Sequence, residues 1–247
     1  MSDQRVTNPY LTPDSTAGTA TSPSTLGVKP DARLATAFLS QAFLWMFVGL
    51  LISGGVAFFV QSNERLLGFA LDNYFILIIA QLALVIGISW GINRISATVA
   101  LGLFFVYAAS LGLTIGLIVS GFTGASVVTA FLSASAMFGA AAIYGSVTKR
   151  SLAGLGGILF MGIIGILVAS LINIFLASDG LNWIISIVGV VIFTALTAYH
   201  VQRIQNGDLA AQTGSMEKGA VIGALLLYLS FVNLFLFMLQ LFGGSRD

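Results

Sequence analysis

The stretch AVIGALLLYLSFVNLFLFML, residues Ala220–Leu239, decides the fold class of this chain. It holds twenty residues without one charged side chain, and its apolar residues lie on every side of a helix rather than on one stripe. A helix rises about 1.5 Å per residue, so this length matches the roughly 30 Å of hydrocarbon in a bilayer. The stretch therefore predicts a membrane-spanning helix.

Six further apolar runs of similar length precede it, separated by short polar breaks that include Lys149 and Arg150. None of the runs contains Asp, Glu or Lys, and none alternates apolar with polar residues as a lipid-exposed barrel would. We expect an all-α integral membrane protein with seven transmembrane helices at about 36–60, 74–92, 97–120, 126–146, 152–177, 181–202 and 219–242.

The composition agrees with this class. The chain has 247 residues, of which 57% are hydrophobic and 8% are charged, against about 25% charged in soluble domains. This balance argues against a soluble enzyme, a nucleic-acid binder and a disordered protein. The absence of cysteine excludes disulfides and thiolate chemistry.

Residues 1–32 differ from the rest, because Thr, Ser, Pro and Gly dominate them. We expect a disordered cytoplasmic tail, followed by one transmembrane domain over 33–247. A cytoplasmic N-terminus would collect eight of the ten basic residues on that side, leaving only Arg65 and Arg246 outside. This bias follows the positive-inside rule, and seven spans then place the C-terminus outside.

Polar side chains inside the spans are costly unless they find partners, so they are candidates for a functional role. His200 is the only ionisable side chain in a predicted span other than tyrosine. We expect Lys149 and Arg150, with Arg94 and Arg203, to anchor the cytoplasmic ends at lipid headgroups. The candidate polar path consists of His200, Ser230, Gln81, Tyr199, Tyr228 and Asn233.

Three motifs in this order resemble the Bax inhibitor-1 (transmembrane Bax-inhibitor-motif) family. They are YGSVTKRSL with the glycine-rich helix after it, LTAYHVQRI and LYLSFVNLF, at residues 144–152, 196–204 and 227–235. The resemblance runs from about residue 33 to the C-terminus. It implies that the last helix lies at the centre of the other six.

The resemblance also implies an activity. Members of this family are described as pH-sensitive calcium leak pathways, as suppressors of cell death and, in one bacterial branch, as modulators of a membrane AAA protease. Leak-type members carry two aspartates that share a proton, and this chain has His200 and Ser230 at those positions. A glutamate often found in the second span corresponds to Gln81.

Two interpretations of His200 remain open at this stage. An imidazole titrates near pH 6.5, so its charge could bias the last two helices against each other. The alternative is a neutral histidine that is hydrogen-bonded to a neighbour. Counted from the predicted cytoplasmic ends, His200 lies about 5 Å deep and Ser230 about 17 Å deep. They meet only if one of the two helices extends beyond its predicted end.

Calcium prefers carboxylate and carbonyl oxygens, so the histidine is a poor substitute ligand. We therefore expect no cofactor and no resident metal, with calcium only as a candidate transported ion. The favoured hypothesis is an ion leak protein of a bacterial inner membrane. The alternative is a non-conducting regulator that binds a membrane AAA protease. No nucleophile–base pair or phosphate loop is present, so we expect no enzyme activity.

Overall fold

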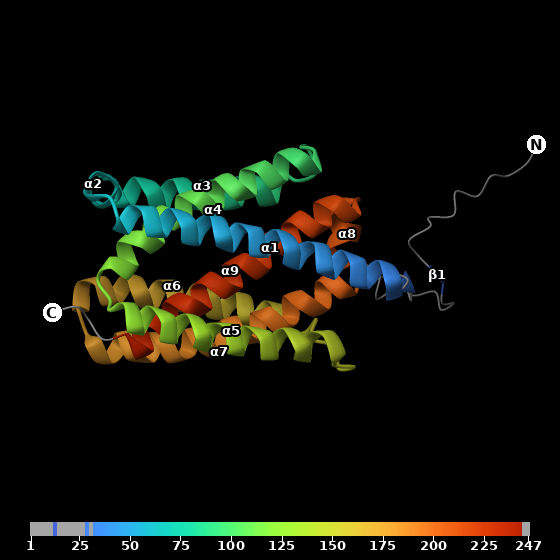
Figure 1. The fold of residues 1–247 in the computed structure, drawn as a ribbon. Helices are drawn as coiled ribbons and strands as arrows, with labels where there is room; N and C mark the ends of the chain where they lie inside the picture. Colours follow the sequence, from blue (N-terminus) through green and yellow to red (C-terminus); the bar gives the residue numbers. More distant parts are fainter. Residues whose placement is uncertain (1–11, 14–27, 30–31, 244–247) are drawn as a thin grey trace, which may run out of the picture.

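The computed structural model describes residues 12–13, 28–29 and 32–243 of the chain. Within them, seven long helices form one elongated bundle (Figure 1). These are α1 (Ala32–Gln61), α3 (Tyr74–Gly91), α4 (Ala97–Ser120), α5 (Gly124–Val147), α6 (Leu155–Leu176), α7 (Asp179–Gln205) and α9 (Met216–Phe242). All seven are long and apolar enough to cross a membrane, as the sequence predicts.

The expected tail falls largely on residues outside the described ones. Its described part is a two-stranded antiparallel pairing of β1 (Thr12–Pro13) with β2 (Val28–Lys29). Thr12 lies opposite Lys29, and Pro13 lies opposite Val28.

Hydroxyl side chains begin most of the later helices. Ser96, Thr123, Ser178 and Ser215 each accept a hydrogen bond from a backbone N–H in the first turn of α4, α5, α7 and α9, respectively. Each cap satisfies one of the donors that a helix N-terminus leaves unpaired. These caps explain why α7 and α9 begin two or three residues before the predicted apolar runs.

Two short helices, α2 (Glu64–Asp72) and α8 (Asp208–Thr213), were not expected from the sequence. The side chain of Asn63 accepts hydrogen bonds from the N–H groups of Arg65 and Leu66 and so starts α2. Helix α8 lies between Gly207 and Gly214, which both have positive φ angles. Such angles suit glycine, which has no Cβ to clash.

Helix α9 lies at the centre of the bundle, which confirms the fold predicted from the resemblance. It packs against α1, α4, α5, α7 and α8, and 72% of an apolar 18-residue stretch of this helix is buried. Helices α3 and α6 lie further out, because α3 packs mainly against α4 and α6 packs against α7. The all-round apolar character of α9 suits a helix that has neighbours on most of its sides.

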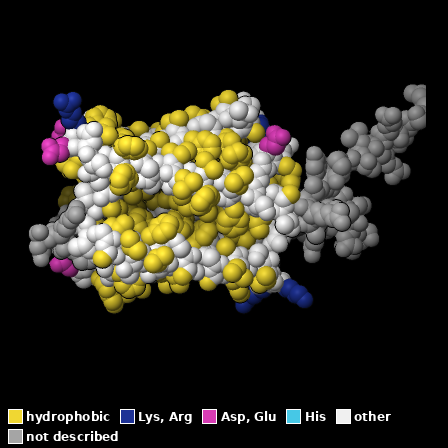
Figure 2. Space-filling view, in the orientation of Figure 1, with side chains coloured by type: hydrophobic (Ala, Val, Ile, Leu, Met, Phe, Trp, Pro, Cys, Tyr) yellow, Lys and Arg dark blue, Asp and Glu magenta, His cyan; other side chains and the backbone are white. Residues whose placement is uncertain are grey.

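The outer faces of the bundle are apolar, and Figure 2 shows hydrophobic side chains over the middle with charged groups towards the ends. Large side chains such as Trp90 and Phe175 are 84% and 88% exposed. In water such a surface would aggregate, whereas in a bilayer it faces acyl chains. The bundle is therefore built to be surrounded by lipid.

Candidate functional site

His200 on α7 and Ser230 on α9 meet inside the bundle, at the positions where the resemblance implies the aspartate pair. His200 Nδ1 lies 3.2 Å from Ser230 Oγ, and both residues are buried. The Ser230 hydroxyl donates its single hydrogen to the Leu226 carbonyl at 2.9 Å. It must therefore accept from Nδ1–H, which leaves Nε2 as an unprotonated acceptor. No described residue hydrogen-bonds to Nε2.

His200 and Ser230 can meet because α7 and α9 are longer than the predicted spans. Helix α7 continues to Gln205, and α9 begins at Met216, so both helices extend beyond the predicted spans. From His200 to the end of α7 is about 8 Å along the helix, and from the start of α9 to Ser230 is about 21 Å. The ten residues 206–215, which contain α8, connect these two unequal depths.

A cavity of about 710 Å³ reaches this contact. Its walls come from α6, α7 and α9, with Val85 of α3. Most of its lining is apolar, and among the lining residues Arg203 carries the only fixed charge. The polar lining residues are Ser170, Tyr199, His200, Arg203, Ser230 and Asn233.

Arg203 lies one turn from His200 on α7 and is held to one side of the cavity. Its guanidinium donates to Gln212 Oε1 at 3.0 Å and lies 5.5 Å from the centre of the Tyr199 ring. A cation over an aromatic face is stabilised by the ring quadrupole. Three other predicted polar-path residues, Tyr199, Ser230 and Asn233, thus line the same cavity as His200 and Arg203.

Two packed aromatic side chains also line this cavity. The rings of Phe193 on α7 and Phe237 on α9 lie 5.8 Å apart, and both line the cavity. A Cβ added at Gly189 would lie 2.5 Å from the Phe237 ring, so this glycine admits the ring. Further along the same interface, Ser186 Oγ lies 2.8 Å from the side-chain amide of Gln240. The α7–α9 interface therefore carries two polar pairs separated by an aromatic pair.

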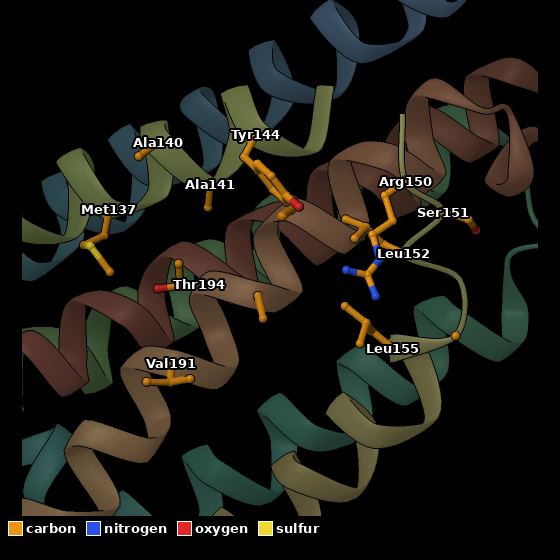
Figure 3. A pocket seen from close by; sticks show the side chains of 13 residues that line it. Met137, Ala140, Ala141, Tyr144, Arg150, Ser151, Leu152, Leu155, Val191 and Thr194 are labelled. Carbon is orange, nitrogen blue, oxygen red and sulfur yellow. The ribbon is translucent and has the colours of Figure 1, made fainter. Parts of the chain in front are cut away.

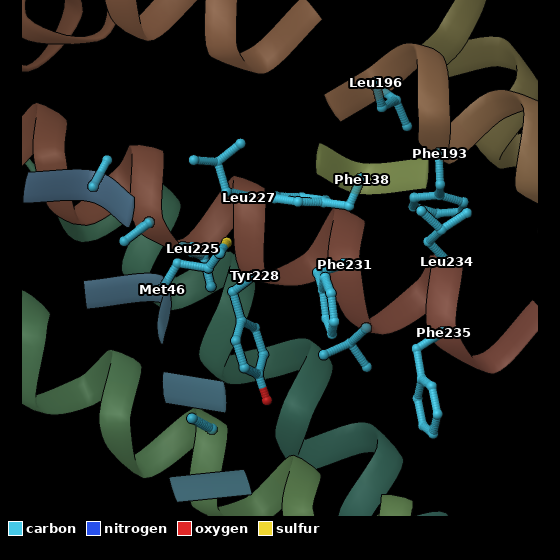
Figure 4. Close-up of a cluster of buried hydrophobic side chains, with 14 of the residues drawn as sticks. Met46, Phe138, Phe193, Leu196, Leu225, Leu227, Tyr228, Phe231, Leu234 and Phe235 are labelled. Carbon is cyan, nitrogen blue, oxygen red and sulfur yellow. The ribbon is translucent and has the colours of Figure 1, made fainter. Parts of the chain in front are cut away.

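The other predicted site residues lie elsewhere. Gln81 Nε2 donates to the Ser110 carbonyl and to Thr114 Oγ1, both on α4, and so joins α3 to α4. The hydroxyl of Tyr228 points away from α7, towards α1 and α4 (Figure 4). Neither side chain lines the cavity.

Asn233 lines the cavity, but its amide nitrogen does not join two helices. Its Nδ2 donates to the Leu229 carbonyl of its own helix at 2.8 Å. This back-bonding satisfies the amide nitrogen within α9. The side chain is therefore a polar wall of the cavity rather than a cross-link.

Two polar side chains have roles that the sequence did not reveal. Gln202 on α7 holds the α5–α6 loop, because it donates to the Arg150 carbonyl at 2.9 Å and accepts from the Leu152 N–H at 2.7 Å. Ser53 on α1 is buried and hydrogen-bonded to Tyr228. Serine in an apolar helix gives no distinctive pattern, and the Gln202 partners lie fifty residues away.

The predicted anchors lie at one end of the bundle. Lys149 and Arg150 are exposed in the α5–α6 loop, which Gln202 ties to the end of α7 next to Arg203. At the start of α9, Lys218 Nζ lies 3.5 Å from the carbonyl of Asn93, the neighbour of Arg94. Within the described residues, no group of three His, Cys, Asp or Glu side chains could hold a metal ion.

These features define the protein as a multi-pass membrane protein with a polar contact between its last two spans. Residues 35–247 match the family described as "Inhibitor of apoptosis-promoting Bax1", and the chain belongs to this Bax inhibitor-1 family. It is 42% identical to the inner membrane protein YbhL of Escherichia coli over 89% of this chain and 96% of that protein. Uncharacterized proteins of Borreliella burgdorferi and Deinococcus radiodurans are each 39% identical, over 89% and 85% of this chain and 97% and 91% of theirs.

Proposed function

We propose that this protein is an inner-membrane leak pathway for protons or monovalent cations, with a gate at the α7–α9 interface. The observation that carries the proposal is the cavity that reaches His200 and Ser230 and is also lined by Phe193 and Phe237. Apolar constrictions in a pore block ions by excluding water. The location rests on the similarity to YbhL, which is named as an inner membrane protein. We expect the protein to have no catalytic activity.

The proposed pathway is not selective for calcium. Calcium requires several oxygen ligands, usually including carboxylates, and the cavity lining contains no carboxylate. The guanidinium of Arg203 beside the cavity also repels a divalent cation more strongly than a monovalent one. The replacement of the aspartate pair therefore changes the ion that the pathway serves.

Acid should open this gate through His200. The charged or titratable groups that face His200 are Arg203 and Tyr199 on its own helix, whereas the cavity lining from α3, α6 and α9 contains no titratable side chain. A proton on Nε2 adds a second positive charge one turn from Arg203. Water entering the cavity would relieve this repulsion, so protonation favours a hydrated, open state.

The test is ion flux in proteoliposomes at about pH 4.5 and about pH 8, a range that extends well into acid because burial and the charge of Arg203 both oppose protonation of His200. We expect potassium or proton efflux several-fold faster at the acidic pH, no calcium signal, and loss of the pH dependence in His200→Gln. Phe237→Ala should leak at both pH values. Phe75 on α3 is 76% exposed, so Phe75→Ala is the matched control and should behave like the unaltered chain.

The absence of flux above empty liposomes for both the unaltered chain and Phe237→Ala would refute the proposal. It would favour a second candidate, a non-conducting regulator of a membrane AAA protease. Dense aromatic packing around α9 supports this candidate. Phe138 and Phe231 pack edge to face, and so do Phe104 and Tyr228. Co-reconstitution with a purified membrane AAA protease tests it, because a regulator must change the rate of proteolysis.

A further inference from the structure

A second groove, separate from the His200 cavity, lies on the membrane-facing side of the bundle. It encloses about 780 Å³, with α7 as its floor and α5 and the beginning of α6 as its walls (Figure 3). Helices α5 and α6 each pack against α7, and the α5–α6 loop closes one end of the groove. Its position at the helix ends places this closed end at the depth of the lipid headgroups.

Apolar and small side chains line the length of this groove. Val191 on the floor is 62% exposed, and Met137 on the α5 wall is 36% exposed. Alanines at 140, 141, 195 and 198 keep the floor and wall low. Water in such a groove would find few hydrogen-bonding partners, whereas an acyl chain would lose nothing by entering it.

The closed end of the groove is basic. The guanidinium of Arg150 extends over it towards Leu155 (Figure 3), and Lys149 is the neighbouring residue. The two hydrogen bonds that Gln202 makes, one donated to the Arg150 carbonyl and one accepted from the Leu152 N–H, fix the backbone on both sides of Ser151, and the Leu152 side chain is buried. No acidic residue occurs between positions 124 and 178, so nothing within these helices neutralises the charge. The loop thus presents a cation from a fixed backbone.

We propose that this groove binds one anionic phospholipid. The phosphate pairs with Arg150, assisted by Lys149, and one acyl chain lies along α7 between α5 and α6. Charge complementarity selects an anionic lipid over a zwitterionic one, since a basic residue near the membrane surface attracts anionic headgroups. The bidentate geometry of a guanidinium also suits a phosphate. This site is independent of any ion flux.

The test uses quenching of tryptophan fluorescence by brominated lipids. Trp45, Trp90 and Trp183 are first replaced by Phe, and a single reporter is introduced as Leu155→Trp in the groove wall or Phe175→Trp at the lipid-exposed far end of α6. The proteins are reconstituted in mixtures of phosphatidylcholine and phosphatidylglycerol in which one lipid is brominated. The ratio of the two quenching curves gives the relative affinity at each reporter.

We expect about a fivefold preference for phosphatidylglycerol at position 155, the factor that corresponds to one basic residue at the surface, and a ratio near one at position 175. Arg150→Gln should bring the ratio at 155 to about one, while Arg94→Gln should leave it unchanged. Equal quenching by both lipids at 155 with Arg150 present overturns the proposal. So does a preference that survives Arg150→Gln. Circular dichroism of each variant confirms that the helices are intact.

Discussion

The hydrogen-bond partners of Tyr228, the buried tyrosine on α9, follow from the number of hydrogens that each hydroxyl can donate. Ser53 Oγ lies 2.9 Å from the carbonyls of Gly49 and Ala108 and is also hydrogen-bonded to the Tyr228 hydroxyl. A serine has one hydrogen, which it donates to one of the carbonyls. The Tyr228 hydroxyl must therefore donate to Ser53. This bond joins α1 and α9, and through Ala108 it also reaches α4.

The two partners in this bond are not equivalent, and substitution should reveal the difference. Ser53→Ala leaves the Tyr228 hydroxyl buried without a partner, which costs about 1–3 kcal/mol. Tyr228→Phe removes the hydroxyl itself, and Ser53 keeps its carbonyl acceptors, so the loss should be about 1 kcal/mol or less. Thermal unfolding in detergent should rank Ser53→Ala as the less stable variant. Adding Tyr228→Phe to Ser53→Ala should recover part of the loss; a further loss would contradict the assigned donor.

Tyr228 also illustrates which contacts of a single residue can be predicted from the sequence and which cannot. His200 and Ser230 were paired correctly, because the resemblance assigns both positions to one contact. Tyr228 lies two residues from Ser230 and so points to another side of the helix. On a helix that is apolar all round, no polar stripe indicates which neighbour each face meets. The partner Ser53 could not be inferred for the same reason.

At the scale of helices, close approach of α5 to α7 depends on Gly145. A Cβ added there would lie 2.8 Å from the Cα and 2.9 Å from the carbonyl carbon of Ala198, and backbone atoms cannot move aside as a flexible side chain can. Gly139, on the same helix, has nothing within 4 Å of the corresponding position. Small residues at such crossings let membrane helices pack by van der Waals contact.

Gly145→Ala should therefore destabilise the bundle, while Gly139→Ala should not. We expect a loss of about 1–3 kcal/mol for the first, the usual cost of overpacking. The second should be neutral or gain up to about 1 kcal/mol, because alanine favours a helix. Apparent melting temperatures by fluorescence-detected gel filtration compare the two. Equal melting temperatures would show that α5 can move away from α7 without cost.

The seven spans could be predicted because each is an uninterrupted apolar run, but α2 and α8 could not. Helix α2 has nine residues and depends on the Asn63 cap and on contacts with α1 and α4. Helix α8 has six residues, too few for a periodic pattern to be read. Helices this short form through tertiary contacts, not through propensity. Without α8, the sequence alone does not fix the depth at which α9 begins.

For the whole molecule, an odd number of spans places the start of α1 and the end of α9 at opposite ends of the bundle (Figure 1). The α3–α4 and α5–α6 loops carry Arg94, Lys149 and Arg150, whereas the α1–α2 connection is followed by Arg65. By the positive-inside rule, we expect the end of the bundle that holds the start of α1 and these two basic loops to face the cytoplasm. The proposed lipid site then belongs to the cytoplasmic leaflet.

Single-cysteine labelling tests this orientation cleanly, since the chain has no cysteine and the unaltered protein serves as the blank. A membrane-impermeant maleimide should label Ser62→Cys and Gly121→Cys in right-side-out vesicles, because these positions precede α2 and α5 at the outer end. Asn93→Cys, between α3 and α4, should be labelled only in inside-out vesicles. The reverse pattern would invert the protein and move the lipid site to the outer leaflet. Labelling of Ser62→Cys and Asn93→Cys from the same side would show that α3 does not cross the membrane, and the seven-span topology would then be wrong.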